Sequence, residues 1–198
     1  MVADSATYEY QPSFVLGFHG CDATVGENLL TGEARHLRPS TKVYDWLGHG
    51  IYFWEGNPSR AMQWAQDRAK KGRIQHPFVV GAMIDLRHCL DLFDQTGLRQ
   101  IEAAHRELVS TFEKADKPMP QNVGSNPDKA GRQLDCAVLN YLHEYRKQRS
   151  EIEYDSVRGP FLEGEPLYPG AGFRRQTHIQ LCIRHTDCIK AYFRPILS

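Results

Sequence analysis

Three short, mostly apolar stretches of the sequence carry side chains that can bind a ligand. His19 and Gly20 close "GFHG", Tyr52 lies within "GIYF", and His178 and Gln180 lie in "THIQLCIR". A histidine or glutamine can hydrogen-bond a hydroxyl group, and a glycine lets a ligand approach the peptide groups of the main chain. A tyrosine ring is a flat wall for an aromatic ligand. Together these residue types suit a flat ligand that carries an amide.

Each of these stretches also has a purely structural interpretation. A tyrosine in a strand is most often packing, and a histidine at a strand end is usually a hydrogen-bonded structural residue. In a strand, Tyr52 faces away from Ile51 and Phe53, so those two are expected in the core and Tyr52 elsewhere. The order along the chain favours function: His-Gly at one strand end, Gly-x-Tyr-Phe about thirty residues later, and a late strand with one polar face.

The elements that would position these residues follow from periodicity and turn signals. The pattern has strands first, helices in the middle and strands at the end, which indicates an α+β fold with an antiparallel or mixed sheet. We expect one domain over residues 1–198. The expected strands are 14–20, 50–53, 77–86, 177–184 and 187–193, and the expected helices are 23–33, 58–71, 97–115 and 132–149.

Composition limits the classes of partner. The 198 residues carry 24 basic and 24 acidic side chains, so the chain has no net field to steer it onto nucleic acid or a membrane surface. No apolar run approaches membrane-spanning length, which predicts a soluble cytoplasmic protein without a membrane partner. The five cysteines are irregularly spaced and include no C-x-x-C pair, which argues against a disulfide framework and a structural zinc.

With these residues in order, the sequence resembles the poly(ADP-ribose) polymerase-like members of the ADP-ribosyltransferase superfamily. "GFHGCD" resembles their Leu-Trp-His-Gly-Ser segment, and "LGHGIYFWEGNPSRA" is similar to their Phe-Gly-Lys-Gly-Ile-Tyr-Phe-Ala-Asp segment. "FVVGAMIDLRHCLDL" resembles the strand that comes next, so the likeness covers residues 14–93, and the last strand pair of that fold suits 177–193. The resemblance implies a split antiparallel or mixed sheet with flanking helices, in a compact, bacterial toxin-like form of the His-Tyr-Glu class.

The resemblance also implies roles for the residues that match. The co-substrate would be NAD, and no metal would be needed. His19 would hydrogen-bond a ribose hydroxyl, the Gly20 main chain would hold the nicotinamide amide, and Tyr52 would stack on the nicotinamide ring. In the family, a serine early in the next helix also binds the amide. Straight alignment puts Arg60 there, and the neighbouring Ser59 is the candidate contact.

The sequence departs from the family at its third catalytic residue. The late strand contains no acid, and the family's glutamate position falls on His178, with Gln180 two residues later on the same face. A neutral side chain stabilises a cation less than a carboxylate does. Glu163 and Glu165, in "FLEGEP" before the strand, are the nearest acids in sequence. Glu163 is the candidate replacement, although a loop carboxylate is usually just solvated. The missing glutamate predicts transfer of a single ADP-ribose, or none, instead of polymer synthesis.

The function expected from the resemblance is NAD-dependent mono-ADP-ribosyl transfer to a macromolecular acceptor, either protein or nucleic acid. The segment before the late strand, with Tyr168, Phe173, Arg174 and Arg175, offers contacts for either acceptor. The compact form suggests a toxin or defence effector, which would add an antitoxin as a partner. Three alternatives stay open: an NAD glycohydrolase, an inactive module that binds NAD or ADP-ribose, and an interaction domain without a ligand.

Overall fold

A computed structural model describes residues 14–124 and 131–196 of the chain. Its helices are α1 (Ala23–Thr31), α2 (Pro58–Lys70), α3 (Gln95–Lys114) and α4 (Gln133–Gln148), with a short 3₁₀ turn at Thr186–Cys188. Its strands are β1 (Phe14–Asp22), β2 (Ile51–Glu55), β3 (Pro77–Asp85), β4 (Cys89–Asp91), β5 (Asn122–Val123), β6 (Gly131–Arg132), β7 (Ser156–Phe161), β8 (His178–Ile183) and β9 (Ile189–Phe193).

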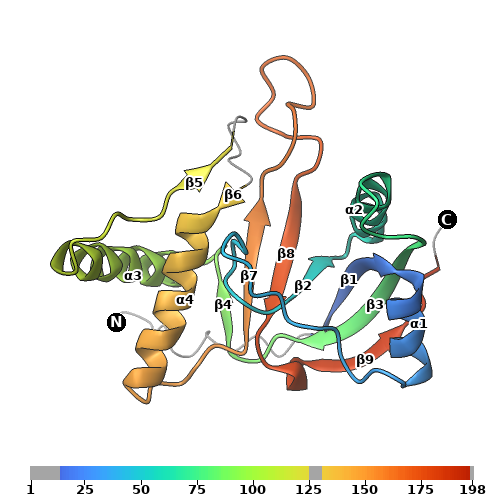
Figure 1. Cartoon of the computed structure of the whole chain (residues 1–198), viewed down its shortest axis with the longest axis horizontal. Helices are drawn as coiled ribbons and strands as arrows, with labels where there is room; N and C mark the ends of the chain where they lie inside the picture. Colours follow the sequence, from blue (N-terminus) through green and yellow to red (C-terminus); the bar gives the residue numbers. More distant parts are fainter. Residues whose placement is uncertain (1–13, 125–130, 197–198) are drawn as a thin grey trace, which may run out of the picture.

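Seven strands form one sheet in the order β4-β7-β8-β2-β1-β3-β9. All neighbours in it are antiparallel except β4 and β7, and β5 and β6 form a separate two-stranded sheet. Figure 1 shows two halves of the main sheet: β4, β7 and β8 stand upright beside α3 and α4, and β1, β3 and β9 run across the picture beside α1 and α2. The expected α+β class with a mixed sheet is confirmed.

The two halves of the sheet are joined by a short contact. β1 pairs with β3 along its whole length, from Phe14 opposite Asp85 to Asp22 opposite Pro77. Its pairing with β2 is limited to Gly17 opposite Glu55 and Phe18 opposite Trp54. Beyond Phe18 the two strands separate, and this separation creates the space in which the candidate site lies.

Side chains from the two faces of the sheet enter different cores. Ile51 and Phe53 are buried with Val80 in the core that α1 covers. Tyr52 points to the other face and packs against the core between the sheet and α4. The alternation expected for residues 51–53 is therefore confirmed. On this second face, α2 covers a third cluster that contains Trp54.

Local sequence signals set the start of α2, the helix nearest the site. Asn57 caps α2, because its side-chain oxygen accepts a hydrogen bond from the main-chain N–H of Arg60 at 2.9 Å. Pro58 takes the first helical position, where its fixed φ favours the helix and its missing N–H costs nothing. These two residues start the helix immediately after β2, so its first turns lie over the separation between β1 and β2.

Sequence patterns missed β4, β7 and the β5–β6 pair. Strand β7 contains Gly159 and Pro160, which read as turn residues in "DSVRGPFLEG". Pro160 is tolerated because β4 pairs only with Ser156 to Arg158, so β7 is an edge strand at the proline. Among the residues that the structure describes, no helix combines the length and apolar character needed to cross a membrane.

Candidate functional site

A pocket of about 320 Å³ opens where β1 and β2 separate. Its walls come from β1, the loop 38–46, β2, α2, the start of the β7–β8 connection and β8. Four of the residues singled out in the sequence line this one pocket, although they come from four separate segments: His19, Tyr52, Glu163 and Gln180.

His19 is fixed by a hydrogen bond across the separation. Its Nδ1 lies 2.7 Å from the main-chain oxygen of Tyr52, and because a carbonyl only accepts, Nδ1 carries the proton. Burial lowers the pKa of His19, and the bond to Tyr52 opposes that shift only in part, so the ring is neutral. Its Nε2 then has a free lone pair, which suits a hydroxyl donor such as a ribose.

The strand register explains why this bond exists. Gly56 N–H donates to Leu16 O at 2.8 Å, so alternate residues of β1 direct their peptide groups toward β2. After Phe18 and Trp54, the next hydrogen-bonded residue pair between β1 and β2 would be Gly20 and Tyr52, and this pair is absent from the ladder. The imidazole of His19 takes the carbonyl oxygen instead, and the Gly20 peptide faces the separation between the strands.

Gly20 has a packing reason to be glycine that the sequence did not reveal. A Cβ at this position would lie 2.3 Å from the main-chain oxygen of Ala61 and 3.3 Å from the Cβ of Ala65. Helix α2 therefore sits directly on Gly20. Gly20 is not among the residues that line the pocket, so the expected contact with an amide would have to come through its peptide group at the separation.

Tyr52 supplies a rigid wall of the pocket. Its hydroxyl donates to Gly48 O at 2.7 Å and accepts from Leu47 N at 3.0 Å. Gly48 has φ of 79°, a left-handed conformation that glycine adopts readily, and this turn brings its carbonyl to the phenol. Burial raises the pKa of Tyr52, so the hydroxyl stays protonated and the ring is held at both ends.

Gln180 lines the pocket from β8, opposite Trp54 of β2. Its Oε1 accepts a hydrogen bond from Nε1 of Trp46. With the oxygen engaged, the group that Gln180 offers a ligand is its amide N–H, which is a donor. This donor suits a ribose oxygen and does not stabilise a developing cation.

Glu163 is held in the pocket by an ion pair. Its Oε2 lies 2.7 Å from Nη2 of Arg60, and the exposed fractions of the two side chains are 25% and 9%. The carboxylate is therefore not simply a solvated loop acid. It lies in the same pocket as His19 and Tyr52.

His178 and Ser59 do not line the pocket. The His178 side chain is fully buried, its Nδ1 donates to Gln176 O at 2.6 Å, and burial lowers its pKa. Ser59 is exposed on the first turn of α2, and the buried Arg60 lines the pocket instead. Of the two residues that the alignment offered at this position, Arg60 lines the pocket and Ser59 does not.

The sequence analysis missed the cationic character of the pocket. Four cations and two carboxylates line it, which gives a formal excess of two positive charges in a chain with none overall. In the described part of the chain, Arg38, Lys42 and Arg68 form no ion pair with a carboxylate. One sequence signal for this character was available. Arg60, Trp64 and Arg68 are spaced i, i+4, i+8, which predicts that they share one face of α2.

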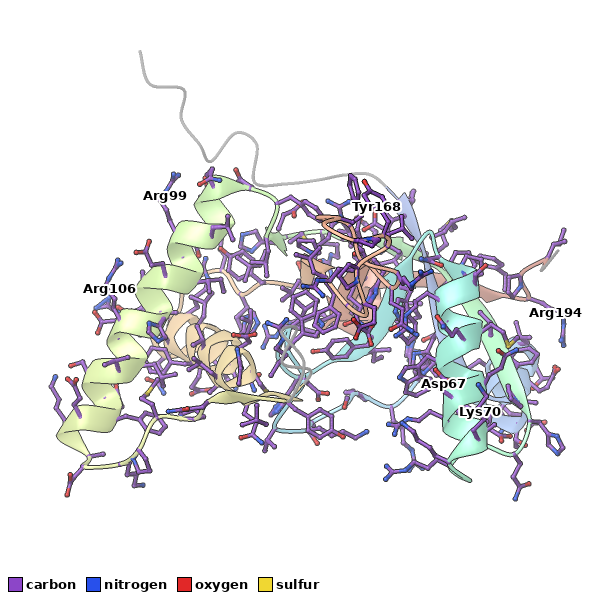
Figure 2. All side chains as sticks on the ribbon, turned by 90° about the horizontal axis from the view of Figure 1, so that it is seen from above. Asp67, Lys70, Arg99, Arg106, Tyr168 and Arg194 are labelled. Atoms are coloured by element: carbon purple, nitrogen blue, oxygen red, sulfur yellow. The ribbon has the colours of Figure 1, made fainter. Side chains whose placement is uncertain are left out.

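The long β7–β8 connection projects beyond the ends of its strands in Figure 1, and Figure 2 shows Tyr168 within it. Tyr168 and Phe173 are 55% and 69% exposed. Arg174 donates to Gly164 O at 3.0 Å, and Arg175 contacts Leu167 O at 3.4 Å. The two aromatic rings thus face solvent, and the two arginines hold the loop's own backbone.

The arrangement can hold a planar ring against Tyr52, a hydroxyl at His19 and an anion among the basic side chains. Within residues 14–124 and 131–196, no group of three or more His, Cys, Asp and Glu side chains could hold a metal ion. Compared with protein-family models, curated proteins and solved structures, the chain shows no match.

Proposed function

We propose that the protein is an NAD-dependent mono-ADP-ribosyltransferase. The observation that carries this proposal is the hydrogen bond from His19 to the Tyr52 carbonyl at the separation of β1 and β2. This bond leaves a lone pair on the imidazole and a fixed phenol ring in one positively charged pocket. Hydroxyl, aromatic ring and diphosphate are the three chemical features of NAD that such a pocket would bind.

In the proposed complex, the nicotinamide ring stacks on Tyr52, where aromatic contact is worth about 0.5–1.5 kcal/mol beyond area burial. His19 Nε2 accepts a hydrogen bond from the nicotinamide ribose. The Gly20 peptide, which faces the separation, is the candidate partner of the carboxamide. The pocket volume of about 320 Å³ suits the nicotinamide-ribose end of the molecule.

The proposed reaction breaks the bond between nicotinamide and C1′ of the ribose. The bonding pair leaves with the pyridinium nitrogen, so nicotinamide departs neutral and positive charge develops on the sugar. A nucleophilic oxygen or nitrogen of the acceptor then bonds to C1′ and loses its proton to solvent. Glu163 is the pocket carboxylate proposed to stabilise the sugar cation, and Gln180 is proposed to donate to a ribose oxygen.

A binding module without turnover is the second candidate, and two observations favour it. Gln180 Oε1 is engaged by Trp46, and the Glu163 carboxylate is engaged by Arg60. Glu163 would have to leave Arg60 before it could act on a sugar cation, and Gln180, with its oxygen engaged, offers only an N–H donor, which does not stabilise a cation. In this case NAD or ADP-ribose would bind with little release of nicotinamide.

The test begins with nicotinamide release from NAD, in the presence of cell lysate that supplies the acceptor, by the wild type, His19→Ala and His76→Ala. His76 is an exposed histidine that does not line the pocket, so it is the matched control. The proposal expects release by the wild type and His76→Ala, and loss of about tenfold or more in His19→Ala. Equal activity in all three proteins would reject the site, and binding without release would favour the module.

The acceptor is tested with labelled NAD in a cell lysate, followed by separate digestion with protease and with nuclease. Loss of the macromolecular label on protease treatment identifies a protein acceptor, and loss on nuclease treatment identifies a nucleic acid. Rapid nicotinamide release that needs no lysate, without any labelled macromolecule, would show a glycohydrolase and contradict transfer.

A further inference from the structure

Unpaired buried polar atoms gather beside Glu163. Eight buried side-chain polar atoms in the described part of the chain have no hydrogen-bond partner, and four of them belong to three neighbouring residues. They are Nε and Nη1 of Arg60, Nε1 of Trp54 and Nε2 of His178. The Arg60 guanidinium lies 5.7 Å from the Trp54 ring centre, and the Trp54 and His178 rings are 6.1 Å apart. Because buried polar groups are normally paired, this concentration suits the binding of a polar ligand.

Arg60 is the centre of this cluster. A guanidinium has five N–H donors in a planar fork, and within residues 14–124 and 131–196 only Nη2 of Arg60 has a hydrogen-bond partner, the Glu163 carboxylate at 2.7 Å. The Arg60 side chain is only 9% exposed, so its Nε and Nη1 groups lie away from bulk solvent. Phosphate oxygens match the guanidinium fork, because two of them can accept parallel hydrogen bonds.

Glu163 occupies the place that such a ligand would take. It stands at the root of the β7–β8 connection, and its carboxylate is more exposed than the arginine it contacts. Other cations of the pocket, including Arg68, have no carboxylate partner in residues 14–124 and 131–196. The surroundings of Glu163 therefore favour the entry of a second anion.

We propose that Arg60 is a phosphate-binding residue of the pocket, and that the Glu163 carboxylate occupies it until a phosphate-bearing ligand takes its place. The exchange replaces one ion pair with another, so the buried guanidinium never lacks a counter-ion. The identity of the ligand as the diphosphate of NAD rests on the proposed function. In that setting, phosphate binding frees Glu163 to act on the nicotinamide ribose, which couples binding of the dinucleotide to placement of the carboxylate.

The test is a titration of the full-length wild type, Glu163→Gln and Glu27→Gln with inorganic pyrophosphate and with ADP-ribose. Glu27 forms an ion pair with Arg194 on the surface, so its variant is the matched control. A neutral glutamine competes less well for a guanidinium than a carboxylate does. We expect Glu163→Gln to bind pyrophosphate about tenfold more tightly and Glu27→Gln to bind as the wild type does. Equal or weaker binding by Glu163→Gln would overturn the proposal.

A second variant removes both partners. Arg60→Met combined with Glu163→Leu replaces the buried ion pair with apolar side chains, a change that proteins often tolerate. With retained circular dichroism and cooperative unfolding, this variant should lose at least about tenfold in pyrophosphate affinity. Affinity equal to that of the wild type would show that the anion binds elsewhere. If either variant fails to fold, a crystal structure of the wild type with pyrophosphate gives the answer: the Arg60 fork should contact phosphate and not Glu163.

Failure of this proposal is distinct from failure of the proposed function. Pyrophosphate has no glycosidic bond, so its affinity reports on the anion site alone, whereas nicotinamide release reports on the reaction. Tighter pyrophosphate binding by Glu163→Gln with no nicotinamide release by the wild type would support the anion site and reject the transferase. Nicotinamide release by the wild type with unchanged pyrophosphate binding in Glu163→Gln would reject the anion site alone.

Discussion

Tyr52 gives the pocket a ring and gives the neighbouring loop a hydroxyl partner, and these two contributions can be removed separately. The hydroxyl bonds Gly48 O and Leu47 N, whereas the ring lines the pocket. A similar division applies to His19, whose Nδ1 is structural and whose Nε2 is available to a ligand. At the scale of residues, a structural hydrogen bond fixes each of these two side chains, and the Tyr52 ring and His19 Nε2 are left for a ligand.

Replacing Tyr52 with phenylalanine and with alanine should therefore give different results. Tyr52→Phe leaves a buried Leu47 N–H unpaired, so the free energy of unfolding should fall by about 1–3 kcal/mol while NAD affinity changes little. Tyr52→Ala should in addition weaken NAD binding by about 0.5–1.5 kcal/mol through lost stacking. Urea denaturation and calorimetric titration measure the two effects. Full NAD affinity in a folded Tyr52→Ala protein would contradict the stacking role.

His143 provides a pH test that is independent of the pocket. It is buried on α4, and neither ring nitrogen has a hydrogen-bond partner among the described residues. Burial, together with the charges of Arg184, Arg146 and His185, lowers the pKa of this side chain from 6.5 to about 3. The folded protein therefore holds the neutral ring at pH values where the unfolded chain takes up a proton.

The sign of the pH effect follows from this difference. The stability that the neutral His143 supports is fully present above about pH 6.5 and is lost as the pH falls, by ~1.4 kcal/mol per pH unit. Between about pH 7 and about pH 5, the wild type should lose ~2 kcal/mol more than His143→Leu, in which the other histidines are unchanged. Urea unfolding at both pH values measures this. Parallel losses in the two proteins would show that His143 does not contribute.

At the scale of elements, the position of α2 on β1 decides whether the pocket exists. The helix starts at the Asn57 cap, lies against Gly20 through Ala61, and directs Arg60 into the pocket. A side chain at position 20 would push the helix away from the strand. The geometry of the pocket wall therefore depends on the absence of a single methyl group.

Gly20→Ala should destabilise the protein and weaken ligand binding together. The added Cβ would lie 2.3 Å from Ala61 O, and overpacking of this kind costs about 1–3 kcal/mol. Gly172→Ala is the control, because a Cβ there meets nothing within 4 Å. Chemical denaturation of both variants gives the comparison. A Gly20→Ala protein as stable as Gly172→Ala would mean that α2 does not rest on Gly20.

The sequence predicted the helices and the strands with clear periodicity, because caps and alternation are local signals. It missed β7, where Gly159 and Pro160 obscure the strand and the pairing partners are distant in sequence. In the pocket, His19 and Tyr52 were identified from motifs, and Glu163 from its place before the late strand. The Arg60–Glu163 contact and the packing reason for Gly20 depend on tertiary neighbours, so no local pattern could show them.

At the scale of the whole molecule, charge is distributed unevenly. The chain has equal numbers of acidic and basic groups, yet the pocket has a formal excess of two positive charges. Figure 2 shows Arg99 and Arg106 on α3 and Lys70 on α2, all away from the pocket lining. A local field of this kind attracts an anionic ligand without making the protein bind polyanions in general.

Neutralising the unpaired cations of the pocket should weaken ADP-ribose binding. The triple variant with Arg38→Gln, Lys42→Gln and Arg68→Gln should lose about tenfold or more in affinity and much of its salt dependence. The control triple variant with Lys70→Gln, Arg99→Gln and Arg106→Gln makes the same change in net charge at exposed sites. Titration at low and high salt separates the two. Equal losses in both variants would show that only net charge matters.

The most direct test of the account is a crystal structure of the protein with a non-hydrolysable NAD analogue. We expect the nicotinamide ring to lie flat against Tyr52, a ribose hydroxyl to contact Nε2 of His19, and the diphosphate to contact Arg60. An analogue bound outside the pocket, or bound in it without contact between its nicotinamide ring and Tyr52, would contradict the central claim. An Arg60–Glu163 pair that stays intact beside the bound analogue would contradict the anion site alone.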